Sequence, residues 1–205
     1  MKKFKLTSEF IVDISGVKLF RIKALIEFGN VKAGDLGGYI EKEENLSHMG
    51  DAWVSGDARI SGDAQVFGDA WVFGNARVFG DAWVFGNARV FGNAWVSGNA
   101  RVFGDAQVSG NARVSGNARV FGDAQVSGDA RVSGDKDYAY AHGFGSCNRT
   151  TTFFRLKDGD VGVRCGCFYG TLAQFRDKVC ETHGETKKAQ EYLMLADLME
   201  IRFKN

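Results

Sequence analysis

The chain has 205 residues, a formal net charge of +1 and 44% hydrophobic residues, which suits one large or two small domains. The near-zero net charge excludes a strong overall field toward nucleic acid or a charged membrane. The 27 glycines recur at a fixed interval and proline is absent, which favours a repeat fold over a disordered linker.

Residues 1–49 are predicted to form an N-terminal β cap. Segments at 4–6, 10–12 and 17–22 look like strands and surround the turn residues Ser15 and Gly16. Just before the regular repeats, the six-residue phase predicts Leu46 in an alanine place and His48 in a valine place.

Residues 50–133 form fourteen hexads of the pattern Gly-[Asp/Asn]-Ala-[Trp/Arg/Gln]-[Val/Ile]-[Phe/Ser], with no insertion. Ala and Val/Ile lie two residues apart, so both point to one side of a short strand and form the core. Gly and Asp/Asn tolerate the left-handed backbone of a turn. One turn and one strand every six residues predict a mainly β protein. We expect a left-handed parallel β-helix, a triangular solenoid of hexapeptide repeats, over residues 50–135.

The outward positions of the hexads are rich in aromatic residues, with 11 among 28 places. Contiguous exposed aromatics usually mark an interface, although stacked rings also stabilise neighbouring strands. Self-association, or docking of the terminal segments, would explain a belt in the middle coils. The predicted interface residues are Trp71, Phe73, Phe79, Trp83, Phe85, Phe91, Trp95, Arg101, Phe103, Arg119 and Phe121.

The charged residues of the hexads leave a second interpretation open. Arginines beside aromatic rings can hold phosphates and stack on bases. The hexads contain seven Arg and eight Asp, which argues against a long nucleic-acid groove. We expect the corner Asp side chains to lie near enough to pair with Arg. A nucleic acid or a small nucleotide stays an alternative partner.

Residues 136–205 are predicted to form a small ββαα unit. Residues 151–156 and 161–168 read as a hairpin, and Thr171 with Gln174 forms a capping box that begins a helix ended by Gly184. The last helix has an apolar face of Ala189, Tyr192, Leu193, Ala196, Met199 and Phe203.

The cysteines and histidines of the chain raise two kinds of chemistry, a metal site and acyl transfer. Cys165, Cys167, Cys180 and His183 could form a tetrahedral zinc site if strand and helix ends meet. The simpler interpretation is that these cysteines are small core residues. Many left-handed hexapeptide helices are acyltransferases that use histidines projecting from the coils. All three histidines, His48, His142 and His183, lie outside the hexads, so we expect no catalytic residues and no cofactor.

Several segments resemble one family. GDLGGYIEKEENLS at 34–47 runs into the G-[DN]-A-x-V repeats, and RTTTF at 149–153 and GCFYGT at 166–171 lie in the tail. These resemble hexapeptide-repeat proteins of bacteria and phages, often labelled polymer-forming or transferase-like. The resemblance implies a phage or prophage origin. It also allows a counter-defence inhibitor, which blocks a CRISPR or other nuclease complex or sequesters a nucleotide, or a hexapeptide acyltransferase.

The sequence therefore predicts a non-enzymatic solenoid that binds or scaffolds. Its expected partners are itself, as a dimer or trimer, and a host or phage protein. No signal peptide or membrane span is expected, and four cysteines are too few for a disulfide framework. We expect a cytoplasmic protein, in the host cytoplasm if it is phage-encoded.

Overall fold

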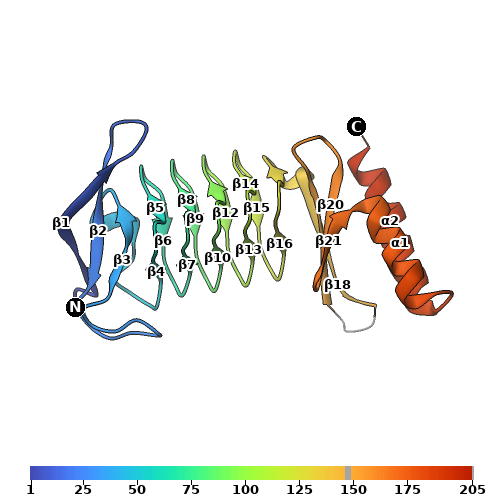
Figure 1. The fold of residues 1–205 in the computed structure, drawn as a ribbon, viewed down its shortest axis with the longest axis horizontal. Coiled ribbons are helices and arrows are strands. Elements are labelled where there is room, and N and C mark those ends of the chain that lie inside the picture. The colour runs from blue at the N-terminus through green and yellow to red at the C-terminus, as the bar shows by residue number, and fades with distance from the viewer. Residues whose placement is uncertain (146–148, 205) are drawn as a thin grey trace.

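The protein is a rod with a small unit at each end (Figure 1). The computed structural model describes residues 1–145 and 149–204. An antiparallel N-terminal unit leads into a parallel β-solenoid, and an antiparallel sheet with two helices follows it. The mainly β solenoid with two C-terminal helices confirms the predicted fold class, while the left-handed sense of the coil stays a prediction.

The elements are bounded as follows. The N-terminal unit contains β1 (Phe4–Val12), β2 (Lys18–Ala24), β3 (Leu36–Ile40) and a short 3-10 helix, η1 (Glu43–Asn45). The solenoid contains β4 (Trp53–Val54), β5 (Arg59–Ile60), β6 (Gln65–Val66), β7 (Trp71–Val72), β8 (Arg77–Val78), β9 (Trp83–Val84), β10 (Arg89–Val90), β11 (Trp95–Val96), β12 (Arg101–Val102), β13 (Gln107–Val108), β14 (Arg113–Val114), β15 (Arg119–Val120), β16 (Gln125–Val126) and β17 (Arg131–Val132). The C-terminal unit contains a second 3-10 helix, η2 (Asp135–Asp137), then β18 (Tyr138–Phe144), β19 (Arg149–Arg155), β20 (Val161–Cys165), β21 (Phe168–Thr171), α1 (Leu172–His183) and α2 (Lys187–Phe203).

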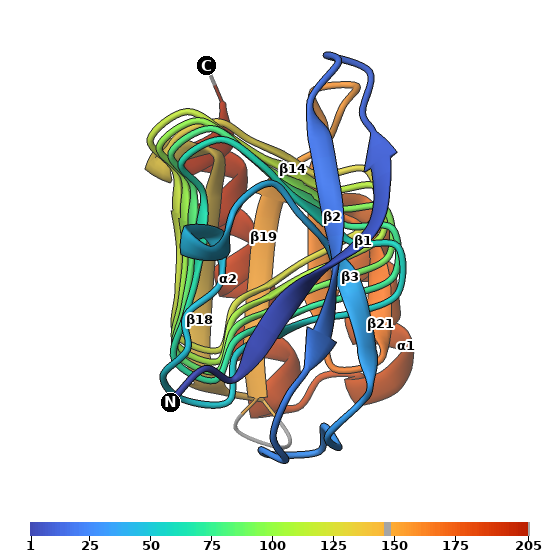
Figure 2. The same ribbon diagram turned by 90° about the vertical axis from the view of Figure 1, so that its left-hand side faces the viewer.

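Each solenoid strand pairs in parallel with the strand one coil later, so residues three hexads apart form vertical columns, as the repeat predicts. Three faces result, and the view along the rod shows them as a three-sided outline (Figure 2). The first face carries β4, β7, β10, β13 and β16. The second face carries β5, β8, β11, β14 and β17, and the third carries β6, β9, β12 and β15.

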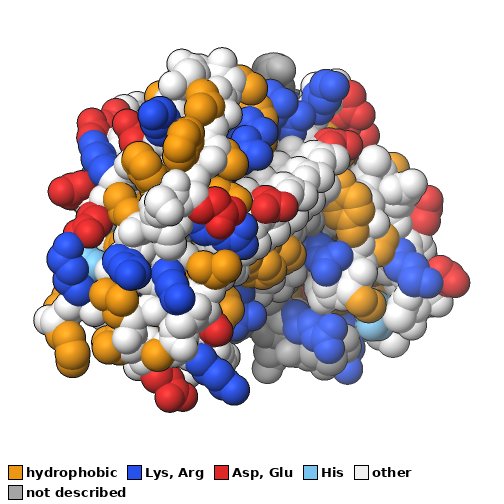
Figure 3. All heavy atoms as spheres, turned by 60° about the vertical axis from the view of Figure 1, so that its left-hand side comes forward, with side chains coloured by type: hydrophobic (Ala, Val, Ile, Leu, Met, Phe, Trp, Pro, Cys, Tyr) orange, Lys and Arg blue, Asp and Glu red, His pale blue; other side chains and the backbone are white. Residues whose placement is uncertain are grey.

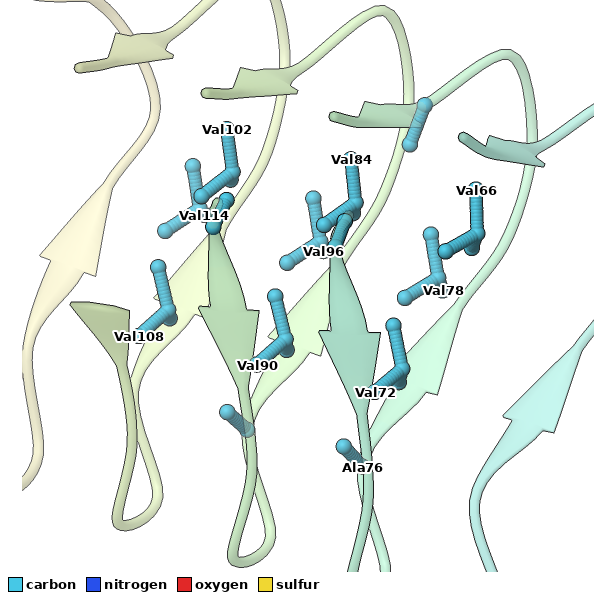
Figure 4. Packing of buried hydrophobic residues seen from close by; sticks show 14 of the residues in the cluster. Val66, Val72, Ala76, Val78, Val84, Val90, Val96, Val102, Val108 and Val114 are labelled. Carbon is cyan, nitrogen blue, oxygen red and sulfur yellow. The ribbon is translucent and has the colours of Figure 1, made fainter. Parts of the chain in front are cut away.

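The core of the solenoid consists of the Ala and Val/Ile places of the hexads. From Ala52 to Ala130 these side chains are completely buried, and the valines of successive coils lie over one another inside the rod (Figure 4). The turns need glycine for two reasons. Gly86, for example, has φ +68°, and a Cβ there would lie 3.0 Å from the backbone nitrogen of Gly104 in the next coil. Backbone conformation and close coil stacking both exclude a side chain.

The N-terminal unit continues one face of the solenoid. β1, β2 and β3 pair antiparallel, and β3 then pairs in parallel with β5. The predicted phase of the preceding hexad is wrong. Leu46 forms a parallel bridge with Val66 in the next coil, so Leu46 takes a valine place. Two extra residues precede the regular repeat, and they leave His48 outside the core, where it stacks on Phe4 at 4.3 Å.

The N-terminal end of the coil presents carbonyl oxygens, because each ladder N–H points toward the next coil, as from Trp53 to Ala70. The cap supplies donors to these carbonyls. Nζ of Lys3 lies 3.1 Å from the oxygen of Gly50 and 2.8 Å from that of Ala52. The side-chain amide of Asn45 donates in the same way to Gly62 and Ala64, at 3.0 and 2.9 Å. These first-rung carbonyls are therefore satisfied by side chains, whereas β3 pairs with the first strand of the second face.

The C-terminal end presents N–H groups, and the cap there supplies acceptors. Asp135 Oδ1 accepts from the backbone of Arg119 at 2.8 Å, and Thr152 Oγ1 accepts from Gln125 at 2.9 Å. Asp137 Oδ2 accepts from the backbone of Ser133 at 2.9 Å. Burial alone would raise the pKa of Asp137, but hydrogen bonds from Ser133 and Gly134 hold it below the usual value. The two caps are thus complementary to the polarity of the ladder.

The C-terminal unit is larger than predicted. The expected hairpin is confirmed as β19 and β20, but β18 and β21 add to its two edges and make a four-stranded sheet. The capping box of Thr171 with Gln174 and the end of α1 at Gly184 are confirmed. The predicted apolar face of α2 is buried at Ala189, Tyr192, Ala196, Met199 and Phe203 and partly buried at Leu193.

Candidate binding surface

The eleven predicted interface residues do not form one patch, because the columns distribute them over all three faces. The third face carries Trp83, Phe85, Arg101, Phe103, Arg119 and Phe121. The first face carries Trp71, Phe73 and Phe91, and the second carries Phe79 and Trp95. The third face is therefore the principal candidate.

A ladder of phenylalanine rings follows the third face. Phe67, Phe85, Phe103 and Phe121 stack with ring centroids 4.8, 4.9 and 5.3 Å apart and interplanar angles of 3°, 3° and 13°. The inner rings are half-buried by their neighbours, and Phe121 is 38% exposed. Phe67 was not among the predicted residues, although it lies three hexads before Phe85 and so shares its column. The structure thus gives the ladder a stacking role within the fold.

Trp83 lies at the centre of the third face. Phe67 meets its ring edge-on at 5.9 Å, and the guanidinium of Arg101 lies over it at 4.7 Å. Two surface grooves meet at this ring. One, of 620 Å³, extends toward Glu43, Glu44 and His48, and the other, of 360 Å³, is lined by Asp63, Gln65, Asp81, Asn99 and Arg101. The face therefore combines aromatic rings, an arginine and carboxylates within reach of one partner.

Trp95 is the centre of the second face, where two arginines enclose its ring. Arg77 lies over one side at 5.2 Å and Arg113 over the other at 4.6 Å, while Phe79 contacts the edge at 5.9 Å. Neither arginine was among the predicted site residues. Their spacing in the sequence could have predicted them, because each lies three hexads from Trp95 and therefore shares its column.

Docking of the terminal segments accounts only for aromatics near the ends of the rod. Phe28 packs edge-on against Trp53 at 5.4 Å, and Tyr140 packs against Phe121 at 5.7 Å. The ring contacts of Trp83 and Trp95 are with side chains of the solenoid itself. Hydrophobic side chains therefore remain at the surface between the two terminal units (Figure 3).

The expected pairing of corner Asp with Arg is wrong. Among the described residues, none of the repeat arginines has a carboxylate oxygen within 4.0 Å, and the ion pairs of Arg21 and Arg176 lie outside the repeats. Arg77, Arg101 and Arg113 lie over tryptophan rings, and Arg131 donates to backbone carbonyls. The corner side chains instead contact the same corner of the next coil, as Asn87 does with Asp105 at 3.0 Å.

The three histidines lie at the ends of the rod and do not converge. Nδ1 of His48 accepts the backbone N–H of Lys3 at 3.2 Å. His142 lies 2.8 Å from Thr150 Oγ1 and 3.7 Å from Asp123 Oδ2. His183 stacks on Tyr192 with ring centroids 5.8 Å apart. No two of them face a common site in the described part of the chain.

The four residues considered for zinc are not brought together as a metal site. Cys165, Cys167 and His183 line one cavity of 240 Å³, while Cys180 is exposed and does not line it. Cys165 Sγ lies 3.1 Å from Thr151 Oγ1. Within residues 1–145 and 149–204, no group of three His, Cys, Asp or Glu side chains has the geometry to hold a metal ion.

Two further findings bear on the class of protein. Among the described residues, no helix has the length and apolarity to cross a membrane. The family model described as the YdcK beta solenoid repeat matches residues 82–98, 94–110, 106–122, 112–125 and 124–135, which together cover less than half of the chain. No curated protein matches the chain. On its repeats and its coil geometry, the chain is a β-solenoid repeat protein.

Proposed function

We propose that the protein is a non-enzymatic binding or scaffold protein that presents its aromatic–arginine third face to a protein partner, a second copy of the chain included. The observation that supports this most directly is the position of the two terminal units. They close the ends of the rod and leave the third face at the surface between them (Figure 1).

The geometry of the aromatic side chains supports the same proposal. Stacking holds the Phe85 ring between Phe67 and Phe103, and Arg101 and Phe67 hold Trp83. Side chains that are already fixed lose little entropy on binding. Trp and Arg are also the residues that most often contribute the binding energy of protein interfaces.

The experiment removes the centre of this face. Trp83→Ala combined with Phe85→Ala should lower the mass in solution, or weaken the binding of a partner isolated with the wild-type protein, by at least about tenfold in affinity. Gln107→Ala combined with Ser109→Ala truncates the same two places of a hexad on the first face and should alter neither. If mass and affinity are unchanged in the third-face variant, the aromatic columns only stabilise the coil.

A second measurement tests the non-enzymatic part of the proposal. Thermal unfolding is followed with acetyl-CoA and with a panel of nucleotides as probes. We expect no rise in the midpoint with any of them. A saturable rise with acetyl-CoA would favour an acyltransferase, and a rise with one nucleotide would favour a small-ligand site.

A further inference from the structure

One edge of the solenoid carries a column of acidic side chains, which we name the acidic edge. It lies between the third and first faces and contains, in successive coils, Asp51, Asp69, Asn87, Asp105 and Asp123. All but Asp51 are exposed, and Asp51 is half-buried beside Gly29. The column thus has four carboxylates and a neutral amide at its centre.

The second face carries a column with the opposite charges and the same arrangement. Its members in successive coils are Arg59, Arg77, Trp95, Arg113 and Arg131. Four guanidinium groups flank a neutral ring at the centre. The nearly neutral total of the repeats conceals this separation, because the three-sided coil places the acidic edge opposite the second face (Figure 2).

Opposite charges within the chain reach only part of each column. Lys3 acts on Asp51 and Asp69, and Asp13 acts on Arg59. Arg89 lines a groove with Asp69 and Asp105 but forms no ion pair with them. Among the described residues, none of the four arginines has a carboxylate oxygen within 4.0 Å, and Asp123 is 3.7 Å from His142. Like charges in adjacent rungs of a sheet repel each other, so both columns are unfavourable in an isolated rod. An oppositely charged column would relieve both.

The corner residues on the two edges of the second face differ in charge from coil to coil. We call each residue of the second-face column, with the corner residues beside it, a row. Neutral amides lie on both sides of the Trp95 and Arg113 rows, from Asn93, Asn99, Asn111 and Asn117. Aspartates lie beside the other rows, and they are Asp57, Asp63, Asp81 and Asp129. One of these, Asp63, pairs with Lys42 at 2.6 Å. The positive charge available to a partner is therefore concentrated around Trp95 and Arg113.

We propose that copies of this chain bind side by side, with the acidic edge of one rod on the second face of the next. Both columns repeat once per coil, at ~4.8 Å. When one residue of the acidic edge lies opposite a residue of the second face, the residues of the other coils are therefore also aligned. Only the register with Asn87 opposite Trp95 places all four arginines opposite aspartates. A slide of one coil sets a carboxylate against the ring. Each column has the same order of charges in both directions, so parallel and antiparallel rods satisfy the match.

The contact predicts an open assembly. The surfaces that meet are different and lie on opposite sides of the rod, so each bound copy presents a fresh second face or acidic edge. The result is a lateral row of rods whose length depends on concentration. This association goes beyond the proposed function, because it uses a surface other than the third face.

A charge-exchange experiment tests the contact. One variant combines Arg77→Glu with Arg113→Glu, and the other combines Asp69→Lys with Asp105→Lys. By sedimentation velocity at low salt, the wild-type chain should form species above its 22.4 kDa monomer mass, and these should dissociate at 1 M NaCl. Each variant alone should remain monomeric. Their mixture should assemble again, because each new charge meets its opposite and the untouched columns still match.

The matched control is Lys187→Glu with Lys188→Glu, which makes the same charge change at exposed positions of α2 and should still assemble. Circular dichroism and the unfolding midpoint establish that each variant keeps its fold. The proposal is overturned if the wild-type chain is monomeric at low salt, if the mixture fails to assemble, or if the control also dissociates. A monomeric wild type that still binds a partner through Trp83 and Phe85 would leave the proposed function intact.

Discussion

Nζ of Lys3 lies 2.8 Å from the carbonyl oxygen of Ala52, at the first rung of the solenoid ladder. Lys3 is only 1% exposed, and its ammonium also lies 4.7 Å from the centroid of the Phe28 ring. An amine is thus buried where the parallel ladder would otherwise present unpaired carbonyls. Open strand edges invite pairing with other chains, so this contact closes the rod against end-to-end addition.

Replacing Lys3 tests that role. Lys3→Met keeps much of the apolar stem but leaves the carbonyls of Gly50 and Ala52 without their donor. We expect the free energy of unfolding in urea to fall by about 1–3 kcal/mol, the usual cost of leaving buried polar groups unsatisfied. Lys5→Met, at an exposed position in β1 two residues later, should change it by less than about 0.5 kcal/mol. Equal effects from the two variants would contradict the capping role.

The same residue predicts a pH dependence. Burial lowers the pKa of Lys3 to about 8 from the usual 10.5, against the opposing charges of Asp51 and Asp69. Between these two values the unfolded chain binds a proton that the folded chain does not, so this group makes the free energy of unfolding rise with pH. The wild-type curve should therefore rise relative to that of Lys3→Met between pH 8 and 10.5. Parallel curves would show that Lys3 titrates normally.

Glycine at the turns can be tested in one coil. Gly86→Ala should lower the free energy of unfolding by about 1–3 kcal/mol, because its φ of +68° disfavours a side chain and the new Cβ approaches the backbone of Gly104 to 3.0 Å. Gly134→Ala is the control. Gly134 has φ −161°, and nothing lies within 4 Å of its Cβ position. Chemical denaturation measures the free energy of unfolding of both variants. A loss in Gly86→Ala alone would assign the effect to the positive φ and the close coil stacking, and equal losses would contradict that assignment.

The stacking role of the phenylalanine ladder has its own test. Phe85 stacks on two rings, at 4.8 and 4.9 Å, whereas Phe91 of the first face stacks on Phe73, at 4.9 Å. At about 0.5–1.5 kcal/mol per aromatic pair, Phe85→Ala should destabilise the fold by about twice as much as Phe91→Ala. Thermal and urea unfolding measure this. If neither change affects stability, the ladder is maintained for binding alone.

Much of the architecture follows from local chemistry. Alternation places Ala and Val inside, Gly provides the turn, and the unbroken six-residue period determines that residues three hexads apart share a column. For the same reason, the capping box of Thr171 and the apolar face of α2 are visible in the sequence. The place of Leu46 in the repeat could not be predicted from the sequence. The two extra residues that follow Leu46 are recognised only when its strand partner, Val66, is known. Nor do β18 and β21 show a clear pattern, since both are edge strands.

The repeat alone thus established a β-solenoid with an apolar core and aromatic outward columns. The tertiary structure decided which side chains those columns bring together and which they keep apart. It divided the predicted belt among three faces and set Arg77 and Arg113 on the ring of Trp95. It also placed the acidic edge opposite the arginines of the second face. The physical reason is that coil closure determines which residues meet from one coil to the next, whereas local pattern determines only which side of a strand a residue occupies.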